Sequence, residues 1–400
     1  MKKHLKPFAA LLFAICLLMG QAAGIALAAD CESTADAAAA WLLRNVPVDA
    51  ADTELDNAAD WTALALARGG YAGYEAYPAY LDGAVQANFD QMYLSDYARA
   101  ALAADAAGGD ARSVGGHDLI DAIVKTDIAQ EVYTDGISYA LLALDAKQYQ
   151  APDEIRQAMV GALCAAQRED GGFNYLLSVN ADDPYSLDGS VDTTGPVLAA
   201  LAPYQADEKV AAVIDRALAF LKASQNPETA GFGFMGSDSA ETISMAVIGL
   251  SALGINPCGP DFTKNGQTML DALLTFVNAD GGMRSYDGSS NILTTYQSLC
   301  ALEAYARFAE QRAAFYDFSD VRQQPPEDTT PESTATTAAP AVTAPEGTEH
   351  SETAGAPEST TAPAAENPAT GSSAAAVGAA VLALLAVGAL AVSRKRGLYA

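Results

Sequence analysis

Apolar residues are concentrated in six segments that are nonpolar on nearly every side, as the sequences of buried helices are. An acidic residue or an asparagine begins each segment. These first residues are Asp60, Asp96, Asp135, Asp192, Glu241 and Asn291. Such residues suit a helix N-cap and the positive end of the helix dipole. We therefore predict six buried helices, each capped by its first residue.

Between the buried segments lie others that carry charges on one side only, which is typical of helices with one exposed face. The clearest cover residues 153–167, 208–225 and 266–277, and weaker examples cover 35–44, 80–89 and 116–125. The alternation predicts an all-α domain, an α/α toroid whose six inner helices line a central cavity inside six outer helices. The alternative is an open helical solenoid, which gives no reason to stop at six pairs.

Glycine-rich turns follow three of the outer segments, at residues 167–173, 225–232 and 278–283. Glycine ends a helix readily because it adopts positive φ. One repeat has the spacing of the QW motif of squalene and oxidosqualene cyclases, through Arg216, Ala217, Phe220, Leu221, Gln225 and Gly231. Residues 36–305 thus resemble the terpenoid cyclase and protein prenyltransferase superfamily, which implies the toroid fold.

The run Asp192-Thr193-Thr194 looks most like the helix starts of the cobalamin carriers of this superfamily, transcobalamin and intrinsic factor. This resemblance makes a corrinoid one candidate ligand, and we expect no other cofactor. Those carriers close over cobalamin with a second, β-rich domain, which has no counterpart after residue 322. A corrinoid is therefore a weaker candidate than the likeness alone implies.

The catalytic residues of the family are missing. Gly189 and Val191 occupy two of the acidic positions of the cyclase motif Asp-x-Asp-Asp, if Asp192 is aligned with its last residue. The Asp-x-Cys of the prenyltransferase zinc site is absent, as is the Gly-Cys-Gly-Glu-Gln thioester sequence. We therefore expect no cyclase activity, no prenyltransferase activity, no thioester and no metal site.

Binding is the function that these exclusions favour. The loops that lead into the inner helices, together with those helices, offer aromatic and acidic side chains suited to a planar or sugar-like ligand. The candidate ligand-binding residues are Tyr139, Tyr175, Tyr185, Asp192, Phe234, Glu241, Tyr286 and Tyr296. We predict a surface binding or adhesion module.

Two other functions remain open. A glycan-degrading hydrolase or lyase needs two suitably separated carboxylates, and its candidate catalytic residues are Asp135, Asp192 and Glu241. The third hypothesis is a structural spacer without a ligand. The 400 residues include 50 acidic and 22 basic ones, so the net charge of −28 excludes a nucleic acid partner.

The two ends of the chain predict its location. Residues 1–28 have the order of a secretory signal peptide, and the toroid follows at 29–322. A linker rich in Pro, Thr, Ala, Glu and Ser covers 323–366. The run Asn367-Pro368-Ala369-Thr370-Gly371 is followed by an apolar stretch over 374–392 and a basic tail. Residues 367–400 thus resemble a Gram-positive sorting signal, with Asn in place of the usual Leu of Leu-Pro-x-Thr-Gly. The resemblance implies that sortase cleaves between Thr370 and Gly371 and joins the chain to peptidoglycan. A single-span membrane anchor is the alternative.

Four cysteines remain after the signal peptide, an even number in an oxidising compartment. Cys164 and Cys300 lie in apolar helical segments and are expected to be buried thiols. Cys31 and Cys258 lie near the mature N-terminus and in a loop. We predict a disulfide between Cys31 and Cys258.

Overall fold

The computed structural model describes residues 27–234 and 237–321. They belong to one compact unit, Met1–Asp328, and a second unit covers Thr329–Ala400. The described residues are almost entirely helical. Their strands are β1 (Gly233–Phe234) and β2 (Ser237–Asp238), a short antiparallel pair. The all-α class is therefore confirmed, whereas the predicted linker, the sorting signal and all but the end of the signal peptide lie outside the described residues.

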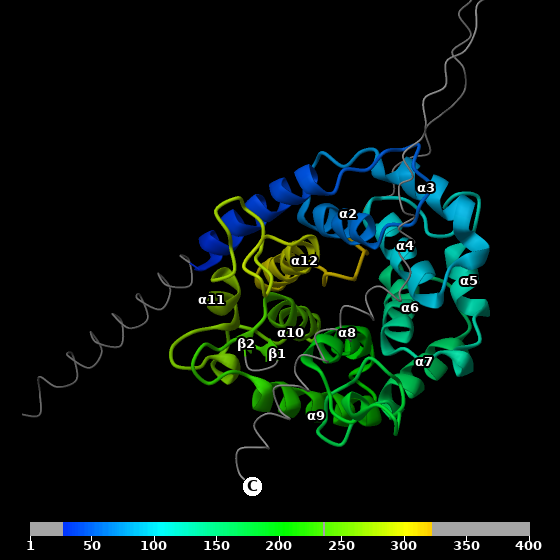
Figure 1. Cartoon of the computed structure of the whole chain (residues 1–400). Coiled ribbons are helices and arrows are strands. Elements are labelled where there is room, and N and C mark those ends of the chain that lie inside the picture. Colours follow the sequence, from blue (N-terminus) through cyan, green and yellow to red (C-terminus); the bar gives the residue numbers. More distant parts are fainter. Residues whose placement is uncertain (1–26, 235–236, 322–400) are drawn as a thin grey trace, which may run out of the picture. The chain divides into compact units, whose positions relative to one another are not determined.

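Six helices form an inner set within this unit. They are α2 (Asn57–Gly69), α4 (Leu94–Ala106), α6 (Thr134–Ala146), α8 (Val191–Leu201), α10 (Ala240–Ala252) and α12 (Ile292–Ala309). Each packs against the next in this order, and α12 packs back against α2. The inner helices therefore form a closed circuit of contacts, visible in Figure 1. Their apolar character follows from this position, since most residues of these helices are buried.

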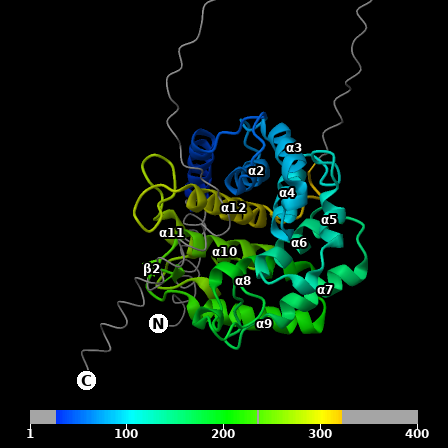
Figure 2. The ribbon, with the colours of Figure 1, turned by 45° about the vertical axis from the view of Figure 1, so that its right-hand side comes forward.

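The other α-helices of the described residues lie outside this circuit, as Figures 1 and 2 show. They are a helix over residues 27–45, α3 (Tyr77–Asn88), α5 (Leu119–Lys125), α7 (Asp153–Ala165), α9 (Glu208–Ser224) and α11 (Met269–Leu274). In α9 the buried residues recur every three or four positions, so only one side packs inward. Short 3₁₀ turns cover Phe89–Gln91, Ile128–Gln130, Pro184–Ser186, Ala202–Tyr204 and Pro260–Phe262.

The first helix joins the last part of the ring. Trp41 Nε1 donates a hydrogen bond to Asp280 Oδ2 at 3.0 Å, and Arg44 donates to the Asp280 carbonyl at 3.1 Å. Gly282 is required at this contact, because a Cβ there would lie 2.8 Å from the Trp41 indole. Hydrogen bonds thus join the first helix to the turn that contains Asp280, about 240 residues away in the sequence.

The repeated glycine turns are structural. The Gln225 side-chain amide donates to the carbonyls of Ala230 in its own turn and Phe262 in the next outer segment, at 2.8 and 2.7 Å. Gln167 makes the equivalent pair of hydrogen bonds to its own turn and to α9. The residues that carry the family resemblance therefore connect neighbouring repeats.

The prediction that the acidic residues cap the inner helices is wrong. Ser190 and Ser239 cap α8 and α10, because their hydroxyls accept N–H bonds from the first turn. Asp192 and Glu241 are consequently the second residues of these helices, and the acids of α2, α4 and α6 also lie inside the first turn. Only Asn291 is a cap as predicted.

A segment after α12 covers one end of the inner helices. Phe315, Tyr316 and Phe318 are buried, and the Phe318 N–H donates to the carbonyl of Ala146, the last residue of α6, at 2.8 Å. Arg68, in the last turn of α2, donates to two carbonyls of the same segment. We call this end, where the inner helices have their C-termini, the base. That residues 313–321 close the base was not predicted from the sequence.

Candidate functional site

The N-terminal ends of the inner helices meet at the end opposite the base. In each of three pairs, side chains from the first two turns of two inner helices contact one another: Asp60 with Arg99, Asp192 with Thr242, and Glu241 with Thr294. We call this end, with the loops that lead into the inner helices, the mouth.

Asp135 and Asp192 occupy equivalent places at the mouth. Each is the second residue of its helix, α6 or α8, and these two helices are in contact. Each side chain is exposed to solvent, and yet burial is the main cause that raises its pKa. A carboxyl group in a recess that solvent can enter is accessible to water and yet largely surrounded by protein, which accounts for both observations. Both residues were predicted as candidate catalytic residues.

The surroundings of the two carboxyl groups differ. Burial raises the pKa of Asp135 and the charge of Glu131 adds to this, whereas an N–H bond from Gly136 at 2.9 Å and the charge of Arg99 oppose it. Burial also raises the pKa of Asp192 and the charge of Glu241 adds to this, whereas hydrogen bonds from Thr242 and Ser190 oppose it because they favour the ionised form. Both groups thus have a raised pKa, and each has a carboxylate neighbour and hydrogen-bond donors of its own.

Glu241 is the third predicted acid, and it is held by two hydroxyl groups. Ser239 Oγ donates to Oε2 at 2.7 Å, and Thr294 Oγ1 donates to Oε1. The carboxylate is half-buried and both its oxygens have protein partners. Glu241 is therefore less available to a ligand than the other two acids.

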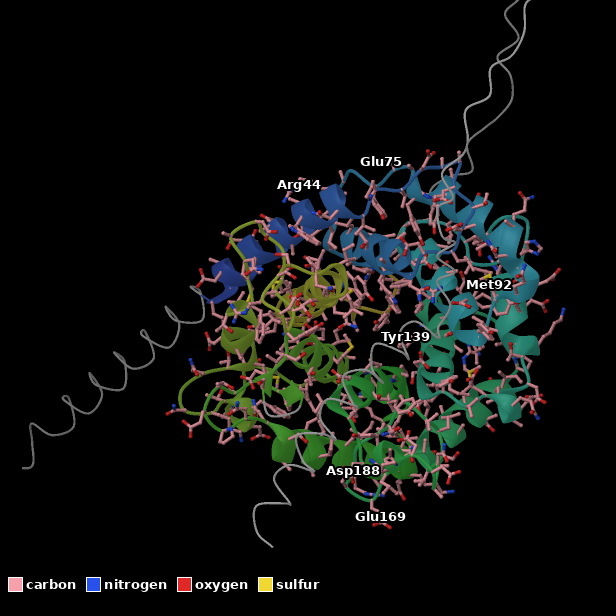
Figure 3. The ribbon with its side chains drawn as sticks, in the orientation of Figure 1. Arg44, Glu75, Met92, Tyr139, Glu169 and Asp188 are labelled. Atoms are coloured by element: carbon pink, nitrogen blue, oxygen red, sulfur yellow. The ribbon has the colours of Figure 1, made fainter. Side chains whose placement is uncertain are left out.

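Aromatic residues lie among the inner helices below these acids. The rings of Trp61 and Tyr139, on α2 and α6, are 4.9 Å apart. Tyr139 lies toward the centre of the ring in Figure 3. Tyr296, on α12, is 9% exposed, and Tyr316 from the base segment lies close enough for its pKa to be affected by Tyr139. Burial raises the pKa of each of these three tyrosines, so their hydroxyls stay protonated.

The rim of the mouth gathers the exposed apolar side chains of the described residues. Each large one lies in a loop that leads into an inner helix or in that helix's first turn. They are Tyr93, Val132, Tyr133, Tyr175, Val179, Tyr185, Leu187, Tyr286 and Leu293. Three predicted ligand-binding tyrosines are among them. Tyr286 is 86% exposed, whereas the Tyr175 hydroxyl donates to Asp183 at 2.5 Å, which raises its pKa to about 12. The Phe234 side chain is outside the described residues.

Arg99 was not predicted as part of the site. Its side chain is buried on α4 and bonds Asp60 Oδ2 and Asp96 Oδ1, both at 2.8 Å. Burial opposes its charge, but the two carboxylates outweigh burial and raise its pKa. Arg99 also lowers the pKa of Asp135 and that of Tyr296. The one sequence signal was a basic residue in the first two turns of an otherwise apolar inner helix.

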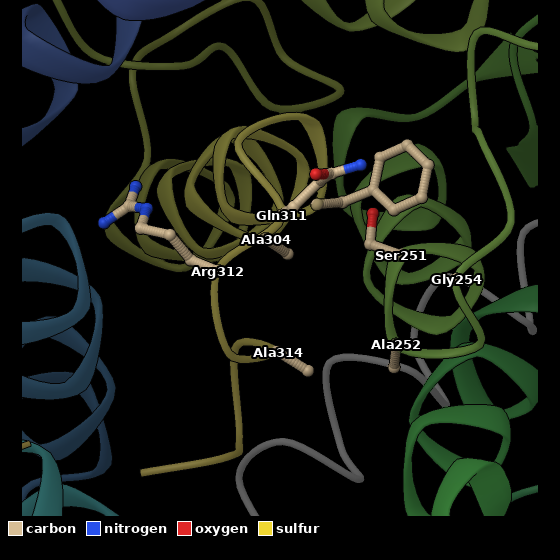
Figure 4. Close-up of a pocket in the computed structure, with 8 residues that line it drawn as sticks. Ser251, Ala252, Gly254, Ala304, Gln311, Arg312 and Ala314 are labelled. Atoms are coloured by element: carbon tan, nitrogen blue, oxygen red, sulfur yellow. The ribbon is translucent and has the colours of Figure 1, made fainter. Parts of the chain in front are cut away.

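A separate cavity of about 320 Å³ lies at the base, shown in Figure 4. It is formed where α10 and α12 end, and Ser251, Phe308 and Arg312 line it. None of the predicted site residues contributes to this cavity. The predicted ligand-binding residues with described side chains belong to the mouth instead.

The two cysteines predicted to form a disulfide are free thiols in the structure. Burial, followed by the charge of Cys258, raises the pKa of Cys31 to about 12. The two side chains are thus close enough to affect one another, and the bridge stays a prediction. Cys300 is buried as expected, whereas Cys164 is half-buried.

Among the described residues, no three or more His, Cys, Asp or Glu side chains are arranged to hold a metal ion. Nor does any helix in residues 27–234 or 237–321 have the length and apolar character needed to cross a membrane. The predicted cleavage site at Thr370 and Gly371 lies outside these ranges.

No family model matches this sequence, and no curated protein matches it. A solved structure described as a polysaccharide lyase is similar in fold, with a TM-score of 0.51 and 15% sequence identity. The match covers 72% of this chain and 99% of the other. At this identity the likeness shows a shared fold and leaves activity open. Membership of the terpenoid cyclase superfamily is not confirmed by it.

Proposed function

We propose that residues 29–322 form an α/α toroid that binds a glycan chain at its mouth and cleaves it. The pair of carboxyl groups Asp135 and Asp192 carries this proposal. The closed circuit of inner helix contacts supports the toroid, and the likeness to a polysaccharide lyase supports a glycan as the substrate. This is the enzymatic alternative of the sequence analysis rather than the binding module favoured there.

The separation of the two carboxyl groups follows from the helices that carry them. Packed helices lie about 8–10 Å apart between axes. Asp135 and Asp192 occupy the same position on neighbouring helices, so their carboxyl groups should be separated by a similar distance. Inverting glycosidases place their two carboxyl groups roughly 6.5–9.5 Å apart, which leaves room for a water molecule. The arrangement therefore favours hydrolysis with inversion.

The two carboxyl groups would divide the work of acid and base. One, kept protonated by burial, would protonate the leaving oxygen. The other, in its ionised form, would remove a proton from the attacking water. Trp61 and Tyr139 would stack against a sugar ring, and the exposed tyrosines of the rim would extend the binding surface along the chain.

The location belongs to the same proposal. A secreted chain held in the cell wall through residues 367–400 would present this domain to extracellular glycans. Sortase and peptidoglycan would then be its partners at the C-terminus, and the linker over 323–366 would separate the domain from the wall.

The test is cleavage of a panel of polysaccharides by the full chain, measured as new reducing ends. Asp135→Asn and Asp192→Asn should each lower turnover about 10²–10⁴-fold, as expected for loss of a general acid or base. Asp215→Asn is the matched control, because this exposed acid lies on the outer helix α9 and its carboxylate has no hydrogen-bond partner among the described residues. Its turnover should be unchanged.

Three results would contradict hydrolysis by this pair. Products with an ultraviolet-absorbing double bond would indicate a lyase. Turnover unaffected by either substitution would place catalysis elsewhere. Binding without any turnover would support the adhesion module instead, and absence of binding as well would support the spacer.

A further inference from the structure

The mouth is strongly acidic. The loop before α8, residues 166–190, contains five acidic residues and a single arginine. Carboxylates also come from first turns and other loops, including Glu131, Asp135, Asp192 and Glu241. The net charge of −28 adds a long-range negative potential. A ligand that enters the mouth therefore meets carboxylates on several sides.

Few positive charges oppose them. Basic residues in the described loops that lead into the inner helices, and in the first two turns of those helices, are limited to Arg99, Arg168 and Arg284. Arg99 is buried and paired with two carboxylates. Arg168 is 5% exposed, and its guanidinium donates to four main-chain carbonyls.

Arg284 is the third arginine. Its guanidinium lies 4.8 Å from the centre of the Phe276 ring, and the side chain is half-buried. One stacked arginine cannot balance the carboxylates around it. A sugar that carries a carboxylate or a sulfate would thus meet more carboxylates than cations among the described residues of the mouth, and the net force on its charge would be repulsive.

We propose that the glycan bound at the mouth carries free, protonated amino groups. This inference rests on the proposed function and names the class of its substrate. An ammonium on a hexosamine supplies the charge that the mouth lacks, and the half-buried Trp61 and Tyr139 would stack against the sugar ring as in the proposed function. Attraction between such a chain and the acidic mouth also speeds encounter and weakens with salt.

The experiment compares three oligosaccharides of equal length by calorimetric titration with the full chain. A glucosamine hexamer and an N-acetylglucosamine hexamer share one backbone and differ in the charge of the amino group. A galacturonate hexamer supplies the opposite charge. We expect the glucosamine hexamer to bind most tightly, with an affinity that falls as salt rises, and the galacturonate hexamer to bind least.

A pair of variants locates the effect. Glu131→Gln removes a charge beside Asp135 but keeps an oxygen that can accept the N–H bonds of Val132 and Tyr133. It should lower the affinity for the glucosamine hexamer about threefold, which is the effect expected of one charge about 6 Å away in water. Glu154→Gln makes the same change on the exposed side of α7 and should have no effect.

Each outcome decides the inference. Equal or tighter binding of the acetylated or galacturonate hexamer overturns it, and so does absence of binding by all three. Equal effects of the two glutamine variants also overturn it, because the attraction would then not come from the mouth. If the glucosamine hexamer binds best and none of the three is cleaved, the inference stands and the proposed cleavage fails.

Discussion

The buried ion pair of Arg99 and Asp60 makes a quantitative prediction about the mouth. Asp60 is 1% exposed and receives hydrogen bonds from Arg99 and from the Tyr77 hydroxyl, both at 2.8 Å. Arg99→Met leaves this carboxylate buried without its cation. Breaking a buried pair in this way costs about 3–5 kcal/mol, because the remaining charge is desolvated and uncompensated.

The assay is reversible unfolding of the full chain in denaturant, with the melting temperature as a second readout. A loss of that size lowers the melting temperature by roughly 5–8 °C for a domain of this size. Arg112→Met is the matched control, since the pair of Arg112 and Asp110 is exposed and should contribute about 0–1 kcal/mol. The double variant Asp60→Asn/Arg99→Met should recover part of the loss.

Two results would refute this reasoning. Arg99→Met could prove no more destabilising than Arg112→Met, which would mean that Asp60 is solvated in its absence. Additive effects of the two substitutions in the double-mutant cycle would mean that the two side chains are not coupled.

Other predictions concern the base and the closure of the ring. Phe318→Ala should destabilise the domain by about 3–5 kcal/mol, as expected for a buried phenylalanine, and unfolding in denaturant with an unchanged midpoint would contradict its packing role. Burial raises the pKa of Glu303 in the folded state above the ordinary value for glutamate. At pH values above that ordinary pKa, keeping the Glu303 carboxylate ionised and buried lowers the free energy of unfolding, and below it the carboxyl is protonated and this loss disappears. Glu303→Gln should therefore raise the unfolding midpoint at neutral pH and leave it unchanged in acid, and the reverse order would be inconsistent with this. Cys31 and Cys258 should form a disulfide in protein exposed to an extracellular thiol oxidase, with a gain of about 2–4 kcal/mol, and alkylation of both thiols without reduction would exclude it.

The helical organisation could be predicted because it depends on local patterns. A helix buried on all sides and a helix buried on one side differ in the spacing of apolar residues, and this difference located both sets of helices. The capping residues could not be located in the same way. Serine and aspartate both suit the start of a helix, and Ser190 and Asp192 are only two positions apart.

The base segment was missed for a different reason. Phe315, Tyr316 and Phe318 have no helical spacing, and the arginine that holds their segment, Arg68, lies about 250 residues away. Arg99 was missed because a single basic residue in an apolar helix does not reveal its partner. The candidate acids could be predicted because they recur at the same place in successive repeats, but their different surroundings depend on side chains from neighbouring helices.

The central claim is that a glycan lies at the mouth between Asp135 and Asp192. A crystal structure of the Asp135→Asn variant with the glucosamine hexamer tests it most directly. We expect a glycosidic oxygen between residue 135 and Asp192, with a sugar ring against Trp61 and Tyr139. Density for the sugar in the base cavity or on the outer helices, with the mouth empty, would contradict it.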